Sequence, residues 1–156
     1  MNSKLHNAVS VLIIMAAVLF IASGCSDSAH NADDHVPDII DVNIKTSPDK
    51  LVLNQPVTIS ATISQGDNRV SDAKEVEFEV WKWGEKNHET LKVKPQEGGV
   101  YSIERMFSSD GIYYVIAHVS ARGMHNMPRR QLIVGTVSEE EIAKANANPD
   151  KSTHKH

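Results

Sequence analysis

Between residues 40 and 134 the chain alternates hydrophobic and polar residues in a series of short stretches. A period of two places successive side chains on opposite faces of an extended strand, so that one face is buried and the other meets water. The stretches are separated by segments rich in Gly, Pro, Asp, Asn and Ser, which favour turns. The alternation predicts seven strands, with buried positions at Ile40/Val42/Ile44, Val57/Ile59/Ala61/Ile63, Val76/Phe78/Val80, Leu91/Val93, Tyr101/Ile103/Phe107, Tyr113/Val115/Ala117/Val119/Ala121 and Leu132/Val134.

Seven short strands at this spacing are typical of an all-β, immunoglobulin-like antiparallel sandwich, which we expect over residues 39–137. Tyr113 follows Asp110 and Gly111 at the start of the sixth strand, the place where such sandwiches carry a tyrosine corner. Trp81 and Trp83 have the parity opposite to the buried positions of the third strand. The pattern therefore assigns neither indole to the core.

The first 25 residues resemble the export signal of a bacterial lipoprotein. A short start carrying Lys4 precedes an apolar stretch at residues 8–22, which predicts a signal helix over residues 1–24. The stretch is shorter than the roughly 20 residues that a transmembrane helix needs. Cys25, the only cysteine, directly follows Ala22, Ser23 and Gly24, as in a lipobox, although Ala22 stands where Leu is commonest. We expect a diacylglyceryl group on the Cys25 thiol; the alternative is a plain secretory signal with a free cysteine.

Polar segments flank the predicted sandwich. Residues 25–38 are polar and acidic without periodicity, and we expect them to tether the domain to the lipidated cysteine. At the other end, residues 138–156 form an acidic and then disordered tail. Ser138 and Glu141 match a capping box, which predicts one or two helical turns at the start of this tail.

Composition and charge exclude several classes of function. The chain has 156 residues, with 16 Lys and Arg against 20 Asp and Glu and a formal net charge of −4, which disfavours nucleic-acid binding. A single cysteine excludes an internal disulfide, a CxxC redox pair and a cysteine zinc site. No nucleophile elbow and no glycine-rich phosphate loop is present in the sequence. We therefore expect a protein that is not an enzyme.

Candidate metal chemistry is concentrated in residues 118–128, HVSARGMHNMP. Met124, His125 and Met127 fall in the predicted turn between the sixth and seventh strands. Thioether sulfur is a soft ligand that suits Cu(I), and imidazole binds either oxidation state of copper. His118 lies on the outer face of the sixth strand, about 10 Å before the end of that strand, so the loop must curl back to reach it. His35, just before the first strand, is a further candidate ligand.

Two observations limit this interpretation. Methionines also fill irregular gaps, so Met124 and Met127 have an alternative role in closing the end of the sandwich. His88 follows the third strand and lies at the opposite end of the predicted sandwich. We therefore expect His88 to take no part in a site built around the 118–128 segment.

Residues 57–135 resemble the YtkA-like domain, which is grouped with the FixH family and found in Bacillus-type lipoproteins. The resemblance is carried by VEFEVWKWGEKNHE (76–89), GGVYSIERMFSSDGIYYVIAHVSARGMHNMP (98–128) and LIVG (132–135). It implies an immunoglobulin-like sandwich and an association with copper handling and assembly of haem-copper oxidases. It also implies a metal-binding role for His118, His125 and Met127, which with Pro128 match the family pattern HxxxxxxHxMP; Met124 lies outside this pattern.

Together these observations predict a lipid-anchored protein on the extracytoplasmic face of the cell membrane. We expect it to bind copper, as Cu(I), through His118, Met124, His125 and Met127, and to hand the ion to a membrane partner such as a haem-copper oxidase or its assembly factor. The alternative is a metal-free immunoglobulin-like interaction module that docks a membrane complex.

The lipid anchor can be tested without reference to the metal. Cells producing the full chain should incorporate radiolabelled palmitate into it, and Cys25→Ser should abolish the label because the thiol is the attachment point. A wild-type chain that is exported but unlabelled would show that residues 1–24 are a plain secretory signal.

Overall fold

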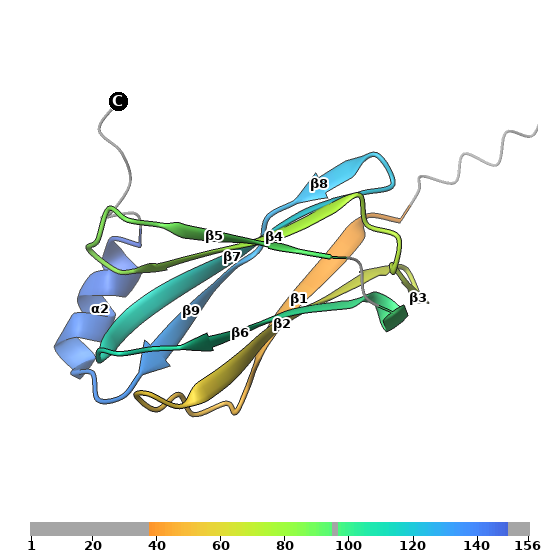
Figure 1. Ribbon diagram of the computed structural model, residues 1–156. Coiled ribbons are helices and arrows are strands. Elements are labelled where there is room, and N and C mark those ends of the chain that lie inside the picture. Colours follow the sequence, from red (N-terminus) through yellow and green to blue (C-terminus); the bar gives the residue numbers. More distant parts are fainter. Residues whose placement is uncertain (1–37, 95–96, 150–156) are drawn as a thin grey trace, which may run out of the picture. The chain divides into compact units, whose positions relative to one another are not determined.

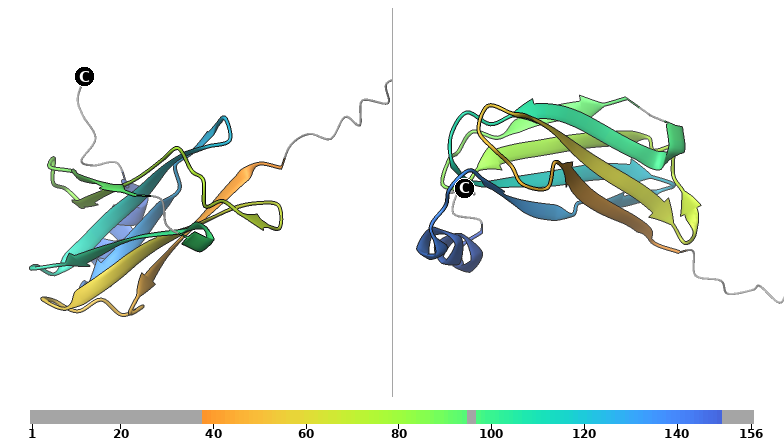
Figure 2. Two further views of the ribbon diagram at one scale, coloured as in Figure 1. Left: turned by 45° about the vertical axis from the view of Figure 1, so that its right-hand side comes forward. Right: turned by 90° about the horizontal axis from the view of Figure 1, so that it is seen from below.

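Two antiparallel sheets pack face to face, as the views in Figures 1 and 2 show. The computed structural model describes residues 38–94 and 97–149. The four-stranded sheet contains β1 (Ile40–Ser47), β2 (Pro56–Gln65), β3 (Asn68–Arg69) and β6 (Val100–Met106). The five-stranded sheet contains β4 (Glu75–Lys82), β5 (Glu89–Val93), β7 (Gly111–Ala121), β8 (Met124–Asn126) and β9 (Arg129–Val134).

Each sheet is organised around one long strand. In the first sheet β2 pairs with β1 on one side and with β6 on the other. In the second sheet β7 pairs with β4, which in turn pairs with β5, while the other edge of β7 pairs first with β8 and then with β9. A short 3-10 turn, η1 (Glu97–Gly99), leads into β6. This arrangement confirms the expected all-β, immunoglobulin-like antiparallel sandwich.

The core lies between the sheets and follows the predicted alternation. All seven expected strands form, and β3 and β8 are additional short strands within the described residues. Val57, Ile59 and Val115 are among the side chains with no exposed surface. At the start of β7, the hydroxyl of Tyr113 donates to the carbonyl of Ser109 at 3.1 Å, which closes the predicted tyrosine corner.

A second, smaller hydrophobic cluster lies on the outer face of the five-stranded sheet. Trp81, Ile112 and Tyr114 point away from the main core and are covered by Ala145 of helix α2 (Glu139–Ala147). The helix begins as the capping box predicts, because the backbone N–H of Glu141 donates to the Ser138 side chain at 3.2 Å. The helix is longer than the one or two turns expected, and its packing explains why Trp81 is buried at a position with outward parity.

Helix α2 is the only described helix longer than a single turn. In residues 38–94 and 97–149, no helix has the length and apolar character required to cross a membrane. The helix is amphipathic only in part: Ala145 is fully buried, whereas Glu139, Glu140 and Lys144 stay exposed. It therefore acts as a cover for one part of the outer sheet face.

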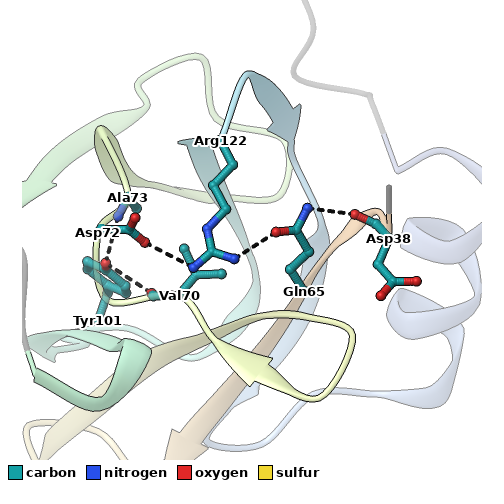
Figure 3. A network of polar contacts seen from close by, with 7 residues as sticks. All are labelled: Asp38, Gln65, Val70, Asp72, Ala73, Tyr101 and Arg122. Atoms are coloured by element: carbon teal, nitrogen blue, oxygen red, sulfur yellow. Dashed lines mark hydrogen bonds and ion pairs between the residues drawn. The ribbon is translucent and has the colours of Figure 1, made fainter. Parts of the chain in front are cut away.

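Buried hydrogen bonds of Tyr101 hold the segment after β3 against the core, as Figure 3 shows. The Tyr101 side chain is fully buried, and its hydroxyl accepts from the N–H of Ala73 and donates to the carbonyl of Val70, both at 3.2 Å. Without the hydroxyl, two buried backbone groups would lose their partner.

Tyr101→Phe should lower the free energy of unfolding by about 1–3 kcal/mol, because an unpaired buried polar group costs about that much. Tyr113→Phe is the matched control, since it removes a hydroxyl that is only part-buried, and it should cost about 1 kcal/mol or less. Urea denaturation of both variants measures the difference. A larger loss for the Tyr113 variant would contradict the assignment.

Candidate functional site

The strands β7 and β8 form a tight hairpin that carries the histidines and methionines singled out in the sequence. Ser120 pairs with His125 and Val119 with Asn126. Strand β9 continues along the same edge of β7, with Ile116 paired to Arg129. The expectation that Met124 and His125 lie in a turn is therefore wrong, because residues 124–126 are a strand that runs back along β7, while Met127 lies in the short break before β9.

The register is the same on both sides of the short break between β8 and β9, which places His118 opposite Met127. The N–H of Ala117 donates to the carbonyl of Pro128 at 3.1 Å, and Pro128 has no N–H of its own with which to extend the ladder. Hydrogen-bonded and non-hydrogen-bonded pairs alternate in an antiparallel ladder. His118 and Met127 therefore form a non-hydrogen-bonded pair, in which Cα atoms lie roughly 4.5 Å apart and side chains are close.

The hairpin turn consists of two residues, Arg122 and Gly123, both with positive φ (50° and 78°). A type I′ turn requires positive φ at both of its central residues. This turn type is common in two-residue hairpins because its backbone twist matches the twist of the two strands. The Arg122 guanidinium donates to Gln65 at 2.7 Å and to Asp72 at 3.4 Å, and Gln65 in turn donates to the carbonyl of Asp38 at 2.8 Å (Figure 3). These contacts tie the tip of the hairpin to the other sheet.

Alternation along the hairpin separates the candidate ligands into two sets. His125 and Met127 are exposed, with 53% of the Met127 surface accessible, and the side chain of His118 is 28% exposed on the same outer face. Met124 has the opposite parity and packs against the main core. The structure thus brings His118, His125 and Met127 to one face and directs Met124 away from them.

We call the exposed part of the outer sheet surface the open face, defined by His118, Ser120, His125, Met127, Glu77 and Glu79. Helix α2 covers the other end of the same sheet surface, as Figure 1 shows. The hydroxyl of Tyr114 donates to the carbonyl of Ala145 at 3.2 Å, and the guanidinium of Arg129 lies 5.3 Å from the Tyr114 ring. Arg129 thus marks the boundary between the helix and the open face. Cys25 and His35 lie outside the described residues.

Glu79, which is not among the ligands predicted from the sequence, links two histidines. Nε2 of His118 lies 2.8 Å from Oε2 of Glu79, and Nδ1 of His88 contacts Oε1 of the same carboxylate. The His88 ring stacks on Trp81, with centroids 4.5 Å apart and an interplanar angle of 7°. The expectation that the opposite end of the sandwich separates His88 from the 118–128 segment is wrong, because His88 and His118 contact the two oxygens of the same Glu79 carboxylate on the outer sheet face.

A sequence signal for Glu79 did exist. Glu77 and Glu79 have outward parity on the third predicted strand, and His118 has outward parity on the sixth, which neighbours the third in an immunoglobulin-like sandwich. The missing information was the register, which pairs Glu77 with His118 and places Glu79 diagonally across from it. The parity of a residue in its strand predicts the sheet face on which its side chain lies, but it does not predict which residue of the next strand lies beside it.

One of the two carboxylates of the open face, that of Glu77, is paired with a lysine. Lys92 contacts Glu75 at 3.0 Å and Glu77 at 2.6 Å. Burial by itself raises the pKa of Glu79, but hydrogen bonds and charge interactions with His88 and His118 outweigh burial and hold its pKa below the ordinary glutamate value. The Glu79 carboxylate is therefore ionised and accepts hydrogen bonds from both rings at neutral pH.

The donor types on the open face determine what it can hold. Within the described part of the chain, no group of three or more His, Cys, Asp or Glu side chains is arranged to bind a metal ion. A site on this face thus needs the Met127 thioether as a third ligand beside the imidazoles of His118 and His125. Nδ1 of His125 lies 2.9 Å from the Ser120 hydroxyl, so its Nε2 is the ring nitrogen that remains to face a ligand. Such a set favours soft ions.

The lowered pKa of Glu79 predicts a pH dependence of stability. A depressed carboxylate pKa adds stability above the unfolded-state pKa, and this contribution is lost as the pH falls through the folded-state pKa. Glu79→Gln should therefore lower the free energy of unfolding near pH 7, and it should cost less near pH 3. Urea denaturation as a function of pH measures this, with Glu104→Gln, an exposed glutamate on β6, as the control. An effect of Glu79→Gln that is equal at both pH values would contradict the assignment.

Comparisons with solved structures find several similar chains at 16% identity. A crystal structure of an engineered protein aligns with 64% of this chain and 20% of its own length (TM-score 0.46), so this chain spans about a fifth of that protein. The PmoD soluble domain from Methylocystis aligns with 63% of this chain and 92% of its own length (TM-score 0.41). The PKD domain of the human receptor SorCS2 aligns with 66% of this chain and 77% of its own length (TM-score 0.40). At these scores the likenesses carry no functional argument. A search of curated proteins finds no match.

The comparison with family models is more specific. The YtkA-like model matches residues 34–118, which is more than half of the chain. The match includes Glu79, His88 and His118 and ends before His125 and Met127. On this match, and in agreement with the resemblance seen in the sequence, the chain belongs to the YtkA-like family.

Proposed function

We propose that this protein binds copper as Cu(I) on the open face, through His118, His125 and Met127, and passes the ion to a partner at the membrane. One observation carries the proposal. The unbroken register of the hairpin sets His118 opposite Met127 and His125 opposite Ser120, so two imidazoles and one thioether share an exposed surface. The proposed ligands thus belong to a strand pair and not to a flexible loop.

The spacing of these side chains suits a shared ion. Directly opposite residues have Cβ atoms about 4.5–5.5 Å apart. Diagonal neighbours such as His118 and His125 lie about 7–8 Å apart, with their Cβ atoms somewhat closer. Side chains of this length span such distances, because each needs to place one donor atom near a common centre. Met124 cannot join them without leaving the core, so it is not part of the proposed site.

The chemistry of the donors favours Cu(I) over other ions. Thioether sulfur binds Zn²⁺, Mg²⁺ and Ca²⁺ poorly and Cu(I) well, whereas imidazole accepts most transition metals. All three ligands are neutral, and the surface is open to solvent, so an acceptor protein can replace them one at a time. The mechanism we propose is capture and transfer by ligand exchange, without bond-making catalysis.

The remaining parts of the proposal concern location and partner. Residues 1–25 resemble a lipoprotein signal, and relatives in the YtkA-like family are associated with copper handling and oxidase assembly. We therefore propose a diacylglyceryl anchor on Cys25, a position on the extracytoplasmic face of the membrane, and a haem-copper oxidase or its assembly factor as the acceptor. A lipid anchor would keep the protein at the membrane that holds such an acceptor.

Cu(I) titration of the domain without its signal tests the site. Wild-type protein should bind one Cu(I), measured by competition with a chromogenic chelator under reducing conditions. Met127→Leu should weaken binding by at least about tenfold, or ~1.4 kcal/mol, because it removes the only sulfur at the site. His118→Ala and His125→Ala should weaken binding to a similar degree.

Met124→Leu is the matched control, since it removes a thioether from the same hairpin on its opposite face. This variant should bind Cu(I) as the wild type does. Loss of binding in Met124→Leu but not in Met127→Leu would contradict the proposed ligand set. Wild-type protein that does not bind Cu(I) would instead favour the alternative of a metal-free interaction module.

A further inference from the structure

We infer that Glu79 is the positioning residue of the proposed copper site, and that its contact with His118 makes Nδ1 the nitrogen through which His118 binds the ion. The inference rests on the proposed function for the identity of the ion. The choice of nitrogen, however, is a property of the protein without copper, and it can be measured there.

The argument begins with the donors and acceptors around the carboxylate. Oε2 of Glu79 lies 2.8 Å from Nε2 of His118, and Oε1 is in contact with Nδ1 of His88. An ionised carboxylate only accepts hydrogen bonds, so each facing ring nitrogen must carry the proton. A neutral His118 therefore has its proton on Nε2 and its lone pair on Nδ1. A metal ion binds the nitrogen that has the lone pair.

The carboxylate is itself held in place. His88, which contacts Oε1 of Glu79, stacks flat on Trp81. Trp81 is 5% exposed and contacts Tyr114, whose hydroxyl is bonded to the carbonyl of Ala145 in α2. A series of contacts thus runs from helix α2 to the ring of His118. This support limits the rotation of Glu79 and, through it, the rotation of the His118 imidazole.

Carboxylates that accept the second N–H of a metal-binding histidine are a general feature of metal sites. They fix the tautomer and the ring orientation, and their loss typically reduces metal affinity about 10–100-fold. Glu77 provides an internal comparison. It lies directly opposite His118 in the register, yet its carboxylate is engaged by Lys92 at 2.6 Å and not by His118. Glu77 therefore brings the same charge close to His118 without the hydrogen bond.

The test uses ¹⁵N-histidine NMR of the domain in the absence of copper, followed by Cu(I) titration. Wild-type His118 should show the tautomer with the proton on Nε2. Glu79→Gln offers one acceptor oxygen for two rings, so the tautomer or the resonance of His118 should change, and the Cu(I) affinity should fall about 10–100-fold. Glu77→Gln removes an equal charge and should leave both the tautomer and the affinity close to the wild-type values.

The outcomes separate this inference from the proposed function. Wild-type His118 with its proton on Nδ1 would overturn the inference whether or not copper binds. Equal Cu(I) affinities of Glu79→Gln and wild type would also overturn it while leaving the copper site intact. A wild-type protein that shows the expected tautomer but binds no Cu(I) would contradict the proposed function and still confirm the role of Glu79 in orienting His118.

Discussion

The site depends on the pairing of β7 with the strand formed by β8 and β9, which runs without a register shift through Pro128. A shift of one residue would exchange the two faces of this strand. Met127 and His125 would then point into the sandwich, and Met124 would point outward. The observed register is held at both ends, because Arg122 bonds Gln65 and Asp72 at the hairpin tip and Gly111 pairs with Val134 at the far end.

The outer face of the five-stranded sheet, to which this strand pair belongs, has two halves with different roles. One half is apolar and covered by α2, and the other half is polar and open. The covered half supports the open half, since Trp81 packs beneath the helix and carries the His88 ring that contacts Glu79. An aromatic cluster that stabilises the fold thus also limits the mobility of the residues that would hold an ion.

The sequence predicted the sandwich and its inward positions because alternation reports burial directly. It did not predict the hairpin over residues 122–126, since Arg-Gly is not one of the dipeptides typical of two-residue turns. Positive φ at Arg122 is maintained by contacts with residues distant in the chain, which no local pattern encodes. Trp81 was left unassigned because outward parity implies exposure unless another element covers it. The Met/His pattern singled out His118, Met124, His125 and Met127 together, but it placed Met124, His125 and Met127 in a turn. That Met124 has the opposite parity from the other three, and that Glu79 contacts His118, required the register.

The most direct test of this account is a nuclear Overhauser measurement of the domain without copper. Hα protons of a non-hydrogen-bonded antiparallel pair lie close together, so His118 and Met127 should show a strong Hα–Hα cross-peak, as should Ser120 and His125. A strong cross-peak from His118 to Asn126 or to Pro128, with none to Met127, would show a shifted register. The two imidazoles and the thioether would then not share a face, and the proposed copper site would not exist.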